Sequence, residues 1–405
     1  MTIQANRANQ VAQQGIASKA VDEFLVTPES DVTPVLSVVM PTLNEEDGIV
    51  ECMDRVKTAI SELRVPTEII VSDSSTDATP ELARERGATV VTPDEPGYGY
   101  AYRYAFDEAR GEYIAMGDAD TTYDFEMIPQ LLEPVRNGDA DICMGSRLEG
   151  EIRDGSMPPL HKYVGNPLLT RFLNTFYGAG VSDAHSGFRV FTKDALETLE
   201  LETTGMEFAS EMIMEAGAND LVIEEVPIIY HEREGEETLD SFSDGWRHVR
   251  FMLVNAPDYL FSYPALLLVS AGAVLMALSV ARLSVAGVNF GIQTMVGGSL
   301  LAIVGYQIWT LALFSSIAAN PINEPDGLLV GMIREQFQLE HGASLGFLAA
   351  AVGVLYLGSV FGQWLLAGQA ALPSATATLL ASTVIVLGLQ TVFGSFFMSM
   401  LADSS

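Results

Sequence analysis

The hydrophobic positions of the chain change character near residue 259. Before that point, short β-branched runs alternate with stretches whose apolar residues recur at helical spacing. The predicted strands cover residues 35–40, 68–72, 88–92, 113–117 and 140–144, and the predicted helices cover 47–63, 80–86 and 99–110. Strands that alternate with helices predict an α/β fold, in which helices cover the faces of a mostly parallel sheet.

Four long apolar segments follow, and a helix needs about 20 such residues to cross a bilayer. They run approximately over 260–281, 294–317, 345–366 and 374–401. None has the polar face of an amphipathic helix, which favours membrane spans over the alternative of buried helices in a large soluble protein. The short connection near 286–290 and the longer one over 320–341 indicate two helical hairpins. A short interfacial helix is predicted over 333–341.

This pattern divides the chain into four parts. Residues 1–34 form a polar tail without the hydrophobic core of a signal peptide. Residues 35–240 form the α/β domain, 241–259 a juxtamembrane interfacial helix, and 260–405 a membrane domain of four helices. An even number of spans and the absence of an export signal predict a multi-pass protein of the cell membrane. Its α/β domain and both termini are expected in the cytoplasm.

Charge is distributed as unevenly as hydrophobicity. The 405 residues include 21 Lys and Arg against 53 Asp and Glu, a net charge of −32, although 48% of residues are hydrophobic. Residues 1–258 hold 19 of the basic and 48 of the acidic residues, a net charge of −29. So acidic a surface excludes nucleic-acid binding, which needs a basic stripe. It indicates adaptation to a salty cytoplasm, since molar salt shortens the Debye length to roughly 3 Å.

Polar clusters follow three of the predicted strands, where ligands bind in sheets of this kind. They cover residues 41–46, 72–79 and 117–120. In the third cluster, Asp118 and Asp120 can jointly hold a hard divalent cation, which neutralises a diphosphate leaving group. The first two clusters are equally compatible with helix caps and polar turns. It is the succession of all three that indicates a nucleotide site.

Together these motifs resemble those of an inverting family 2 glycosyltransferase with the GT-A fold, of the polyprenyl (dolichyl) phosphate mannose and glucose synthase type. The resemblance covers roughly residues 35–260. It is carried by Pro41, Asn44, Glu45, Asp73, Gly97-Tyr98-Gly99, Arg103, Asp118, Asp120, Gly145-Ser146-Arg147, Ser186-Gly187-Phe188-Arg189, Arg233, Gly235, Ser241-Phe242 and Gly245-Trp246-Arg247.

The resemblance implies transfer of a hexose from GDP-mannose or UDP-glucose to a polyprenyl phosphate, for glycan assembly or protein glycosylation. It implies Mg²⁺ or Mn²⁺ as cofactor, held by Asp118 and Asp120, and it implies catalytic roles for Asp120, Arg147 and Arg233. The residues expected to bind the donor are Pro41, Asn44, Glu45, Asp73, Gly97, Gly99, Arg103, Asp118 and Arg189. Those expected to bind the acceptor are Lys162, Arg171, Ser186 and Arg233.

Three departures from the family pattern bear on these roles. Ser72 stands where the first of two adjacent aspartates is usual, and residues 233–239 lack the Ser and Lys that often follow the arginine. A phosphate contact is therefore missing or supplied by His231, Arg247 or Arg250. The Gln-x-x-Arg-Trp signature of processive synthases is absent, which favours a single transfer.

The chemistry of a phosphate acceptor suits this set of residues. A phosphate monoester has a second pKa of about 6 and attacks without a general base, whereas a sugar hydroxyl needs one. Basic residues are scarce in this acidic chain, although each is equally compatible with a structural ion pair. Glu207 and Glu211, on a predicted helix over 205–216, are the candidate bases for a hydroxyl acceptor. We expect both to be structural.

Two amphipathic stretches, 158–177 and 246–261, combine aromatic and apolar residues with basic ones. They are typical of helices in the membrane interface, and the alternative is a pair of core helices beneath the sheet. Two other functions remain open: transfer to a lipid or glycan hydroxyl, and a non-catalytic membrane protein that handles lipids. The membrane helices also allow a homo-oligomer.

Overall fold

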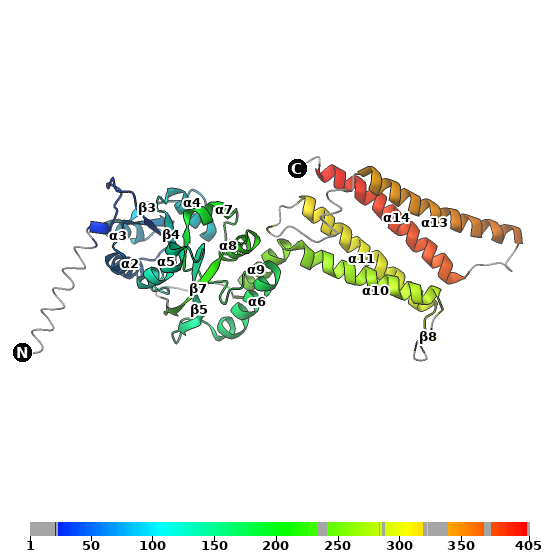
Figure 1. Ribbon diagram of the computed structural model, residues 1–405, viewed down its shortest axis with the longest axis horizontal. Helices are drawn as coiled ribbons and strands as arrows, with labels where there is room; N and C mark the ends of the chain where they lie inside the picture. Colours follow the sequence, from blue (N-terminus) through cyan, green and yellow to red (C-terminus); the bar gives the residue numbers. More distant parts are fainter. Residues whose placement is uncertain are drawn as a thin grey trace, which may run out of the picture. The chain divides into compact units, whose positions relative to one another are not determined.

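The computed structural model describes residues 21, 23–233, 241–282, 284, 285, 288–318, 322, 339–367 and 374–402. It divides into two compact units, residues 1–252 and 253–405 (Figure 1). Each unit is described on its own.

A seven-stranded sheet forms the centre of the first unit, in the order β3-β2-β1-β4-β6-β5-β7. All of its strands run in one direction except β6, which pairs antiparallel with both β4 and β5. The strands are β1 (Leu36–Thr42), β2 (Thr67–Asp73), β3 (Thr89–Val91), β4 (Tyr113–Met116), β5 (Ile142–Ile152), β6 (Arg189–Thr192) and β7 (Ile223–Tyr230).

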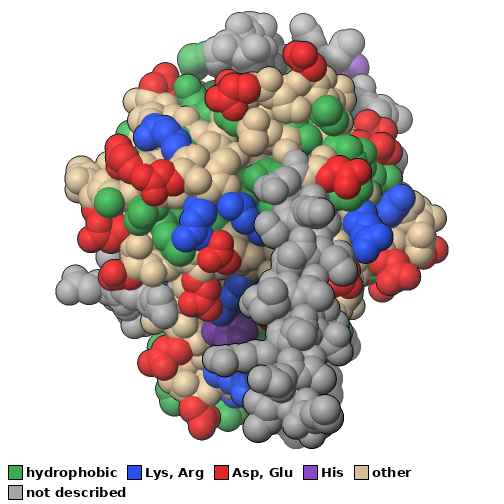
Figure 2. Space-filling view, turned by 90° about the vertical axis from the view of Figure 1, so that its left-hand side faces the viewer, with side chains coloured by type: hydrophobic (Ala, Val, Ile, Leu, Met, Phe, Trp, Pro, Cys, Tyr) green, Lys and Arg blue, Asp and Glu red, His purple; other side chains and the backbone are tan. Residues whose placement is uncertain are grey.

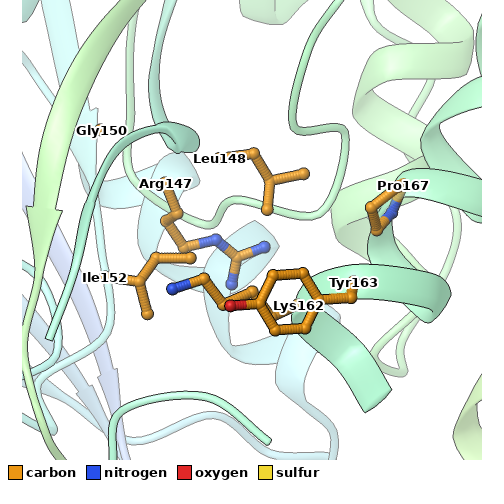
Figure 3. A pocket seen from close by; sticks show the side chains of 7 residues that line it. All are labelled: Arg147, Leu148, Gly150, Ile152, Lys162, Tyr163 and Pro167. Atoms are coloured by element: carbon orange, nitrogen blue, oxygen red, sulfur yellow. The ribbon is translucent and has the colours of Figure 1, made fainter. Parts of the chain in front are cut away.

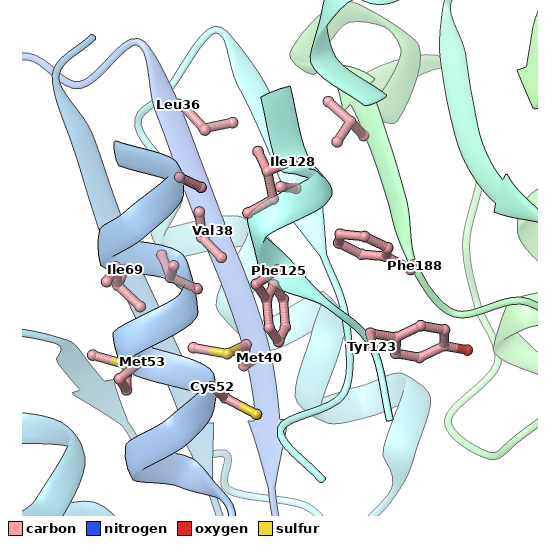
Figure 4. Close-up of a cluster of buried hydrophobic side chains, with 14 of the residues drawn as sticks. Leu36, Val38, Met40, Cys52, Met53, Ile69, Tyr123, Phe125, Ile128 and Phe188 are labelled. Atoms are coloured by element: carbon pink, nitrogen blue, oxygen red, sulfur yellow. The ribbon is translucent and has the colours of Figure 1, made fainter. Parts of the chain in front are cut away.

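Helices cover both faces of this sheet (Figure 1). The helices of residues 49–254 are α2 (Ile49–Leu63), α3 (Thr79–Glu85), α4 (Tyr98–Glu108), η1 (Phe125–Met127), α5 (Ile128–Asn137), η2 (His161–Gly165), α6 (Asn166–Tyr177), α7 (Lys193–Thr198), α8 (Phe208–Ala218) and α9 (Ser241–Val254). One face packs on α2 and α5, and Figure 4 shows alternate β1 residues, among them Val38 and Met40, directed at Met53 of α2 and Phe125 of η1. Because alternate strand residues point to opposite faces, Val39 of β1 is buried on the other face, where α4 contacts β1 and β2.

The predicted α/β fold is confirmed, and the five predicted strands correspond to β1–β5. The fifth was predicted too short, because β5 continues to Ile152 through an irregularity between Ser146 and Glu151. The predicted helix over 158–177 is two consecutive elements, η2 and α6, and that over 246–261 corresponds to the end of α9 and η3 (Asp258–Ser262). The interfacial helix predicted over 333–341 lies largely outside the described residues.

The second unit contains the predicted membrane helices. After η3 come α10 (Tyr263–Val280), α11 (Ile292–Ala318), α13 (Leu339–Ala367) and α14 (Ala375–Ala402), and a small ladder of β8 (Ser284–Val285) and β9 (Val288–Asn289) joins α10 to α11. Four segments are long and apolar enough to cross a membrane: Asp258–Val280, Ile292–Ser315, His341–Leu366 and Ala375–Leu401. Most of their surface is exposed, as lipid-facing helices require.

Small residues and hydroxyl pairs hold these four helices together. Gly272 and Gly298 bring α10 and α11 so close that a Cβ on either would approach the other helix's backbone within 3 Å. Between α11 and α14, Ser299 pairs with Thr383 at 2.6 Å, and Tyr306 pairs with Thr391 at 2.6 Å. Such contacts are the usual basis of helix association in lipid, where the hydrophobic effect between helices is absent.

Charge on the protein surface follows the sequence. Figure 2 shows acidic side chains spread over one face of the molecule, with small groups of basic side chains among them. No continuous basic stripe is visible on this face.

Candidate active site

The loops after β1 and β2 are joined to each other by hydrogen bonds. The Thr42 hydroxyl donates to Asp73 Oδ1 at 2.8 Å, the Asn44 amide donates to Ser75 Oγ at 2.7 Å, and the Thr76 amide donates to Asn44 Oδ1 at 2.9 Å. Asn44 lies in the left-handed region, with φ of 59°, which asparagine tolerates better than most residues. The structure therefore brings Asn44 and Asp73 together at the carboxyl edge of the sheet, with Asp73 buried and its carboxylate fixed.

Asp118 and Asp120 follow β4 at the same edge. Asp118 Oδ1 accepts hydrogen bonds from the hydroxyls of Tyr98, at 2.8 Å, and Tyr102, at 3.2 Å. Asp120 Oδ1 accepts from the Thr122 amide at 3.2 Å. Thr121 lies between Asp120 and Thr122 in the sequence. Its φ of 65° is a strained backbone conformation for a residue with a β-branched side chain.

Arg55 of α2 secures this strained turn. Its Nη1 donates to the carbonyl oxygens of Thr121 and Tyr123, both at 3.2 Å. The loop that carries Asp120 is thus held from the side of α2, and this contact was not predicted from the sequence.

Arg233 joins the same cluster from the segment after β7. Its guanidinium lies 2.7 Å from Glu45 Oε1 and 3.7 Å from Asp120 Oδ2. Burial raises the pKa of Glu45 to about 7, with Arg233 opposing this shift and Asp120 and Asp118 adding to it. Burial, and then the charge of Asp120, raise the pKa of Asp118 to about 6. Three carboxylates thus share one guanidinium, which leaves the cluster short of positive charge.

This deficit fits a divalent cation. Among the described residues, no group of three or more His, Cys, Asp or Glu side chains is arranged to hold a metal ion. Mg²⁺, however, is usually bound by only one or two protein carboxylates together with substrate phosphates and water. Asp118 and Asp120 suit such a site if the donor diphosphate supplies the remaining oxygens.

The two glycines of the Gly97-Tyr98-Gly99 motif have a packing role that the resemblance did not indicate. A Cβ on Gly97 would lie 2.2 Å from the carbonyl oxygen of Thr204, and Gly97 has a φ of 140°. A Cβ on Gly99 would lie 2.6 Å from the carbonyl oxygen of Thr203. Arg103 donates to the carbonyl oxygen of Glu202 at 2.7 Å. Gly97, Gly99 and Arg103, which were predicted to bind the nucleotide sugar, therefore contact the loop at residues 202–204. Tyr98 is the residue of this motif that reaches Asp118.

Two residues predicted to contact substrate, Arg189 and Ser186, are fully buried in this structure. Arg189 opens β6 in the middle of the sheet and donates to the carbonyl oxygens of Ser186, Ala184 and Ala209 at 3.0, 3.2 and 2.8 Å. Burial lowers its pKa to about 10. Ser186 is buried beside it. Arg189 therefore binds the backbone at Ala184, Ser186 and Ala209, and its predicted contact with the donor stays a prediction.

Arg147 already has a carboxylate partner. Its Nε and Nη2 donate to the two oxygens of Asp183 at 2.7 and 2.9 Å, and both side chains are buried. Burial alone would raise the pKa of Asp183, but Arg147 outweighs it and the carboxyl pKa is lowered. The charge of Arg147 is thus paired within the fold, and its predicted catalytic role stays a prediction.

A cavity of about 260 Å³ lies beside this pair, and Figure 3 shows Arg147 and Lys162 directed into it. The rest of the lining is mainly apolar, and its residues are Leu148, Gly150, Ile152, Tyr163 and Pro167. Within the described part of the chain, no carboxylate pairs with Lys162. Arg171, the other predicted acceptor cation of this segment, is exposed on α6 and does not line the cavity.

Aromatic side chains connect this cavity to the carboxylate cluster. The guanidinium of Arg147 lies 5.2 Å from the ring centre of Tyr230, and Tyr230 lies 5.4 Å from the ring of Tyr123. Tyr123 follows Asp120 by three residues, and its hydroxyl accepts from the Gly187 amide at 2.7 Å. The cavity and the carboxylates are therefore neighbouring parts of one region.

The two candidate bases are both engaged. Glu211 Oε1 accepts from the amides of Glu202 and Thr203 at 2.9 and 3.1 Å, and Oε2 accepts from the Thr203 amide at 3.1 Å. Glu207 lies 3.5 Å from Arg247. These contacts agree with the expectation that both glutamates are structural.

Comparisons with known proteins agree with this picture. Residues 37–200 match the family Glycosyl transferase family 2, and residues 318–402 match the Glycosyltransferase family 2 C-terminal transmembrane region. The low-salt glycan biosynthesis hexosyltransferase Agl6 of Haloferax volcanii is 56% identical over 382 residues, which cover 94% of this chain and 92% of that protein. A dolichyl-phosphate hexose transferase of the same organism is 34% identical over 211 residues, 52% of this chain and 89% of that protein.

Among solved structures, the chain is similar to glucosyl-3-phosphoglycerate synthase from Mycobacterium tuberculosis in complex with Mn²⁺, UDP and glucosyl-3-phosphoglycerate. The identity is 24% and the TM-score is 0.45, over 57% of this chain and 86% of that one. The identity and coverage of the Haloferax hexosyltransferase confirm the resemblance expected from the motifs. The chain belongs to glycosyltransferase family 2, and it joins a GT-A domain to the C-terminal transmembrane region of that family.

Proposed function

We propose that this glycosyltransferase transfers a hexose, with inversion, from a nucleotide sugar to a polyprenyl (dolichyl) phosphate. The observation that carries the proposal is the cavity beside Arg147. It presents the amine of Lys162 among apolar side chains, next to the carboxylates that follow β4. A volume of about 260 Å³ has room for a group larger than a single water molecule, such as a phosphate.

The donor would lie over the joined loops after β1 and β2. Asp73 faces this edge and is the candidate partner for the base or ribose, with Asn44 and Glu45 beside it. Asp118 and Asp120 would hold Mg²⁺ or Mn²⁺, whose charge would offset that of the departing diphosphate. Arg233, which already bridges Glu45 and Asp120, supplies a second positive charge at the same place.

A phosphate acceptor agrees with the state of the acidic residues. Its second pKa is about 6, so at neutral pH it is largely dianionic and attacks the anomeric carbon without a general base. A hydroxyl acceptor would need such a base. Of the two candidates, Glu211 is saturated by backbone donors and Glu207 is paired with Arg247.

The helices beside the cavity support access from a membrane. Leu160 before η2, Tyr163 and Val164 in η2, and Leu168 in α6 are more than half exposed. Lys162 lies among them, so an apolar surface with a basic residue surrounds the cavity mouth. This is the composition of an interfacial helix. We infer that it contacts the cytoplasmic leaflet, and four spans would then put the chain on both sides of them in the cytoplasm.

The names of two relatives are consistent with this reaction, one being a hexosyltransferase of glycan biosynthesis and the other a dolichyl-phosphate hexose transferase. The choice between GDP-mannose and UDP-glucose is part of the test. Membranes that contain the protein would be incubated in molar KCl with polyprenyl phosphate and a panel of labelled nucleotide sugars.

The expected product is a lipid-linked sugar that mild acid releases while the phosphate stays on the lipid. Membranes with the Asp120→Asn variant provide the control. Label in an acid-stable glycolipid would contradict the phosphate acceptor and indicate transfer to a hydroxyl. Absence of transfer from every donor would favour a non-catalytic role.

A further inference from the structure

Helix α4 directs two tyrosines at one oxygen of Asp118. Tyr98 and Tyr102 are four residues apart and therefore lie side by side on the helix. Their hydroxyls reach Asp118 Oδ1 at 2.8 and 3.2 Å. Both phenols thus hydrogen-bond to the same carboxylate oxygen.

Packing fixes both rings. Tyr102 is fully buried and stacks on Phe208 of α8, with ring centres 5.5 Å apart. Tyr98 meets the edge of Tyr102 at 5.2 Å. Because the rings are held by the core, their hydroxyls are in place before any ligand arrives.

Gly187 lies beside the second oxygen of this carboxylate, Oδ2, and beside the Tyr98 hydroxyl. A Cβ on Gly187 would lie 3.3 Å from Asp118 Oδ2 and 3.3 Å from the Tyr98 hydroxyl oxygen. Among the described residues, no donor is hydrogen-bonded to Oδ2. One oxygen of Asp118 is therefore saturated by phenols and the other is left for a different partner.

We propose that Tyr98 and Tyr102 are positioning residues, which hold Asp118 so that Oδ2 is the oxygen offered to a divalent cation. This inference rests on the proposed function for the role of the cation. The partners that hydrogen-bond to a metal-binding carboxylate fix its orientation, and their loss typically lowers metal affinity ten- to a hundredfold. Without the two hydroxyls the carboxylate would turn more easily about its terminal bond, a torsion with a broad distribution.

The test uses the full-length protein in detergent and Mn²⁺ as the probe. Electron paramagnetic resonance measures unbound Mn²⁺, with and without a nucleoside diphosphate, in molar KCl that screens the acidic surface. The variants are Tyr98→Phe, Tyr102→Phe and the double change, all of which keep the rings. The matched control is Tyr100→Phe on the same helix, which also removes a hydrogen bond to a carboxylate, that of Asp94.

Each single change at Tyr98 or Tyr102 should raise the Kd for Mn²⁺ about tenfold and the double change up to about a hundredfold, whereas Tyr100→Phe should leave it within about twofold. Melting temperatures of all variants are compared, because a merely structural role would lower stability without changing the Kd measured on folded protein.

Two results would overturn the inference in different ways. If the tyrosine variants bind Mn²⁺ like the wild type while Asp120→Asn does not, the positioning role is wrong and the proposed function stands. If the wild type binds no Mn²⁺ even with nucleotide, both the positioning role and the metal part of the proposed function are wrong. The assay for lipid-linked sugar then decides the transfer reaction separately.

Discussion

Replacing Lys162 by Met separates acceptor binding from folding. Methionine keeps the length and apolar stem of the side chain and removes only its charge. Lys162 has no carboxylate partner in the described part of the chain, so the change breaks no ion pair among those residues. Its amine lies 5.7 Å from the ring centre of Tyr163, a contact that contributes about 0.5–1 kcal/mol at an exposed site. The fold should therefore tolerate this variant.

The loss of the Lys162 charge should weaken binding of the acceptor phosphate. A hydrogen bond between a lysine and a phosphate contributes about 1.5–3 kcal/mol. Lys162 is only half-buried, which favours the lower part of this range, about 1.5–2 kcal/mol. The apparent KM for polyprenyl phosphate should then rise roughly ten- to thirtyfold.

Arg147→Met, unlike Lys162→Met, should lower the stability of the fold. The side chains of Arg147 and Asp183 are 8% and 0% exposed, and removing one partner of a buried pair costs about 3–5 kcal/mol of folding stability. We expect a large fall in melting temperature for this variant. Lys57→Met, on α2, serves as the matched lysine control for Lys162→Met.

The assay measures initial rates of lipid-linked sugar formation against polyprenyl phosphate at saturating donor, and nucleotide binding without lipid. Lys162→Met should raise the apparent KM for polyprenyl phosphate and leave the affinity for the nucleotide unchanged. An unchanged KM for the lipid, or a loss of nucleotide binding, would show that Lys162 does not bind the acceptor phosphate and that the cavity has another use.

Three further predictions concern metal, salt and pH. Asp120→Asn should abolish transfer while leaving the protein folded and inserted, and wild-type activity that persists in EDTA would contradict the metal site. With a net charge of −29 on residues 1–258, the melting temperature should rise from low to molar KCl, and a flat curve would exclude adaptation to salt. Burial, with Glu211 and Glu200 adding to it, raises the pKa of Glu215 from 4.5 to about 7, so stability should fall as pH rises from about 4.5 to 7. Glu215→Gln should remove up to about 3 kcal/mol of this pH-dependent loss of folding stability. Glu133→Gln, at an exposed position, should leave the loss unchanged. Melting curves at pH 5 and pH 8 would measure both variants.

The sequence predicted the architecture because its signals are local. β-branched runs, helical periodicity and long uncharged segments each depend on neighbouring residues, and their order predicts a parallel sheet followed by membrane spans. Strand β6 was missed for a related reason. It spans only Arg189–Thr192 and enters the sheet antiparallel, which no local pattern indicates.

The roles of the basic residues could not be read in the same way. The motif that ends in Arg189 resembles a phosphate site, but β6 carries that side chain into the core between β4 and β5. Arg147 is paired with Asp183, a residue 36 positions away that nothing in the sequence connects to it. The tyrosines at 98 and 102 did carry a signal, since they lie one helical turn apart beside a glycine motif. Their common target became visible only from the structure, in which both hydroxyls reach Asp118 in the loop after β4.

The two hydroxyl pairs between α11 and α14 together fix the register of one helix against the other. Ser299 and Tyr306 are seven residues apart, and their partners Thr383 and Thr391 are eight apart. Sliding one helix past the other by a single turn, about 5.4 Å, would separate both pairs at once. In lipid, apolar helix surfaces can shift along each other with little change in free energy. The two hydroxyl pairs thus select one register out of several that apolar packing alone would permit.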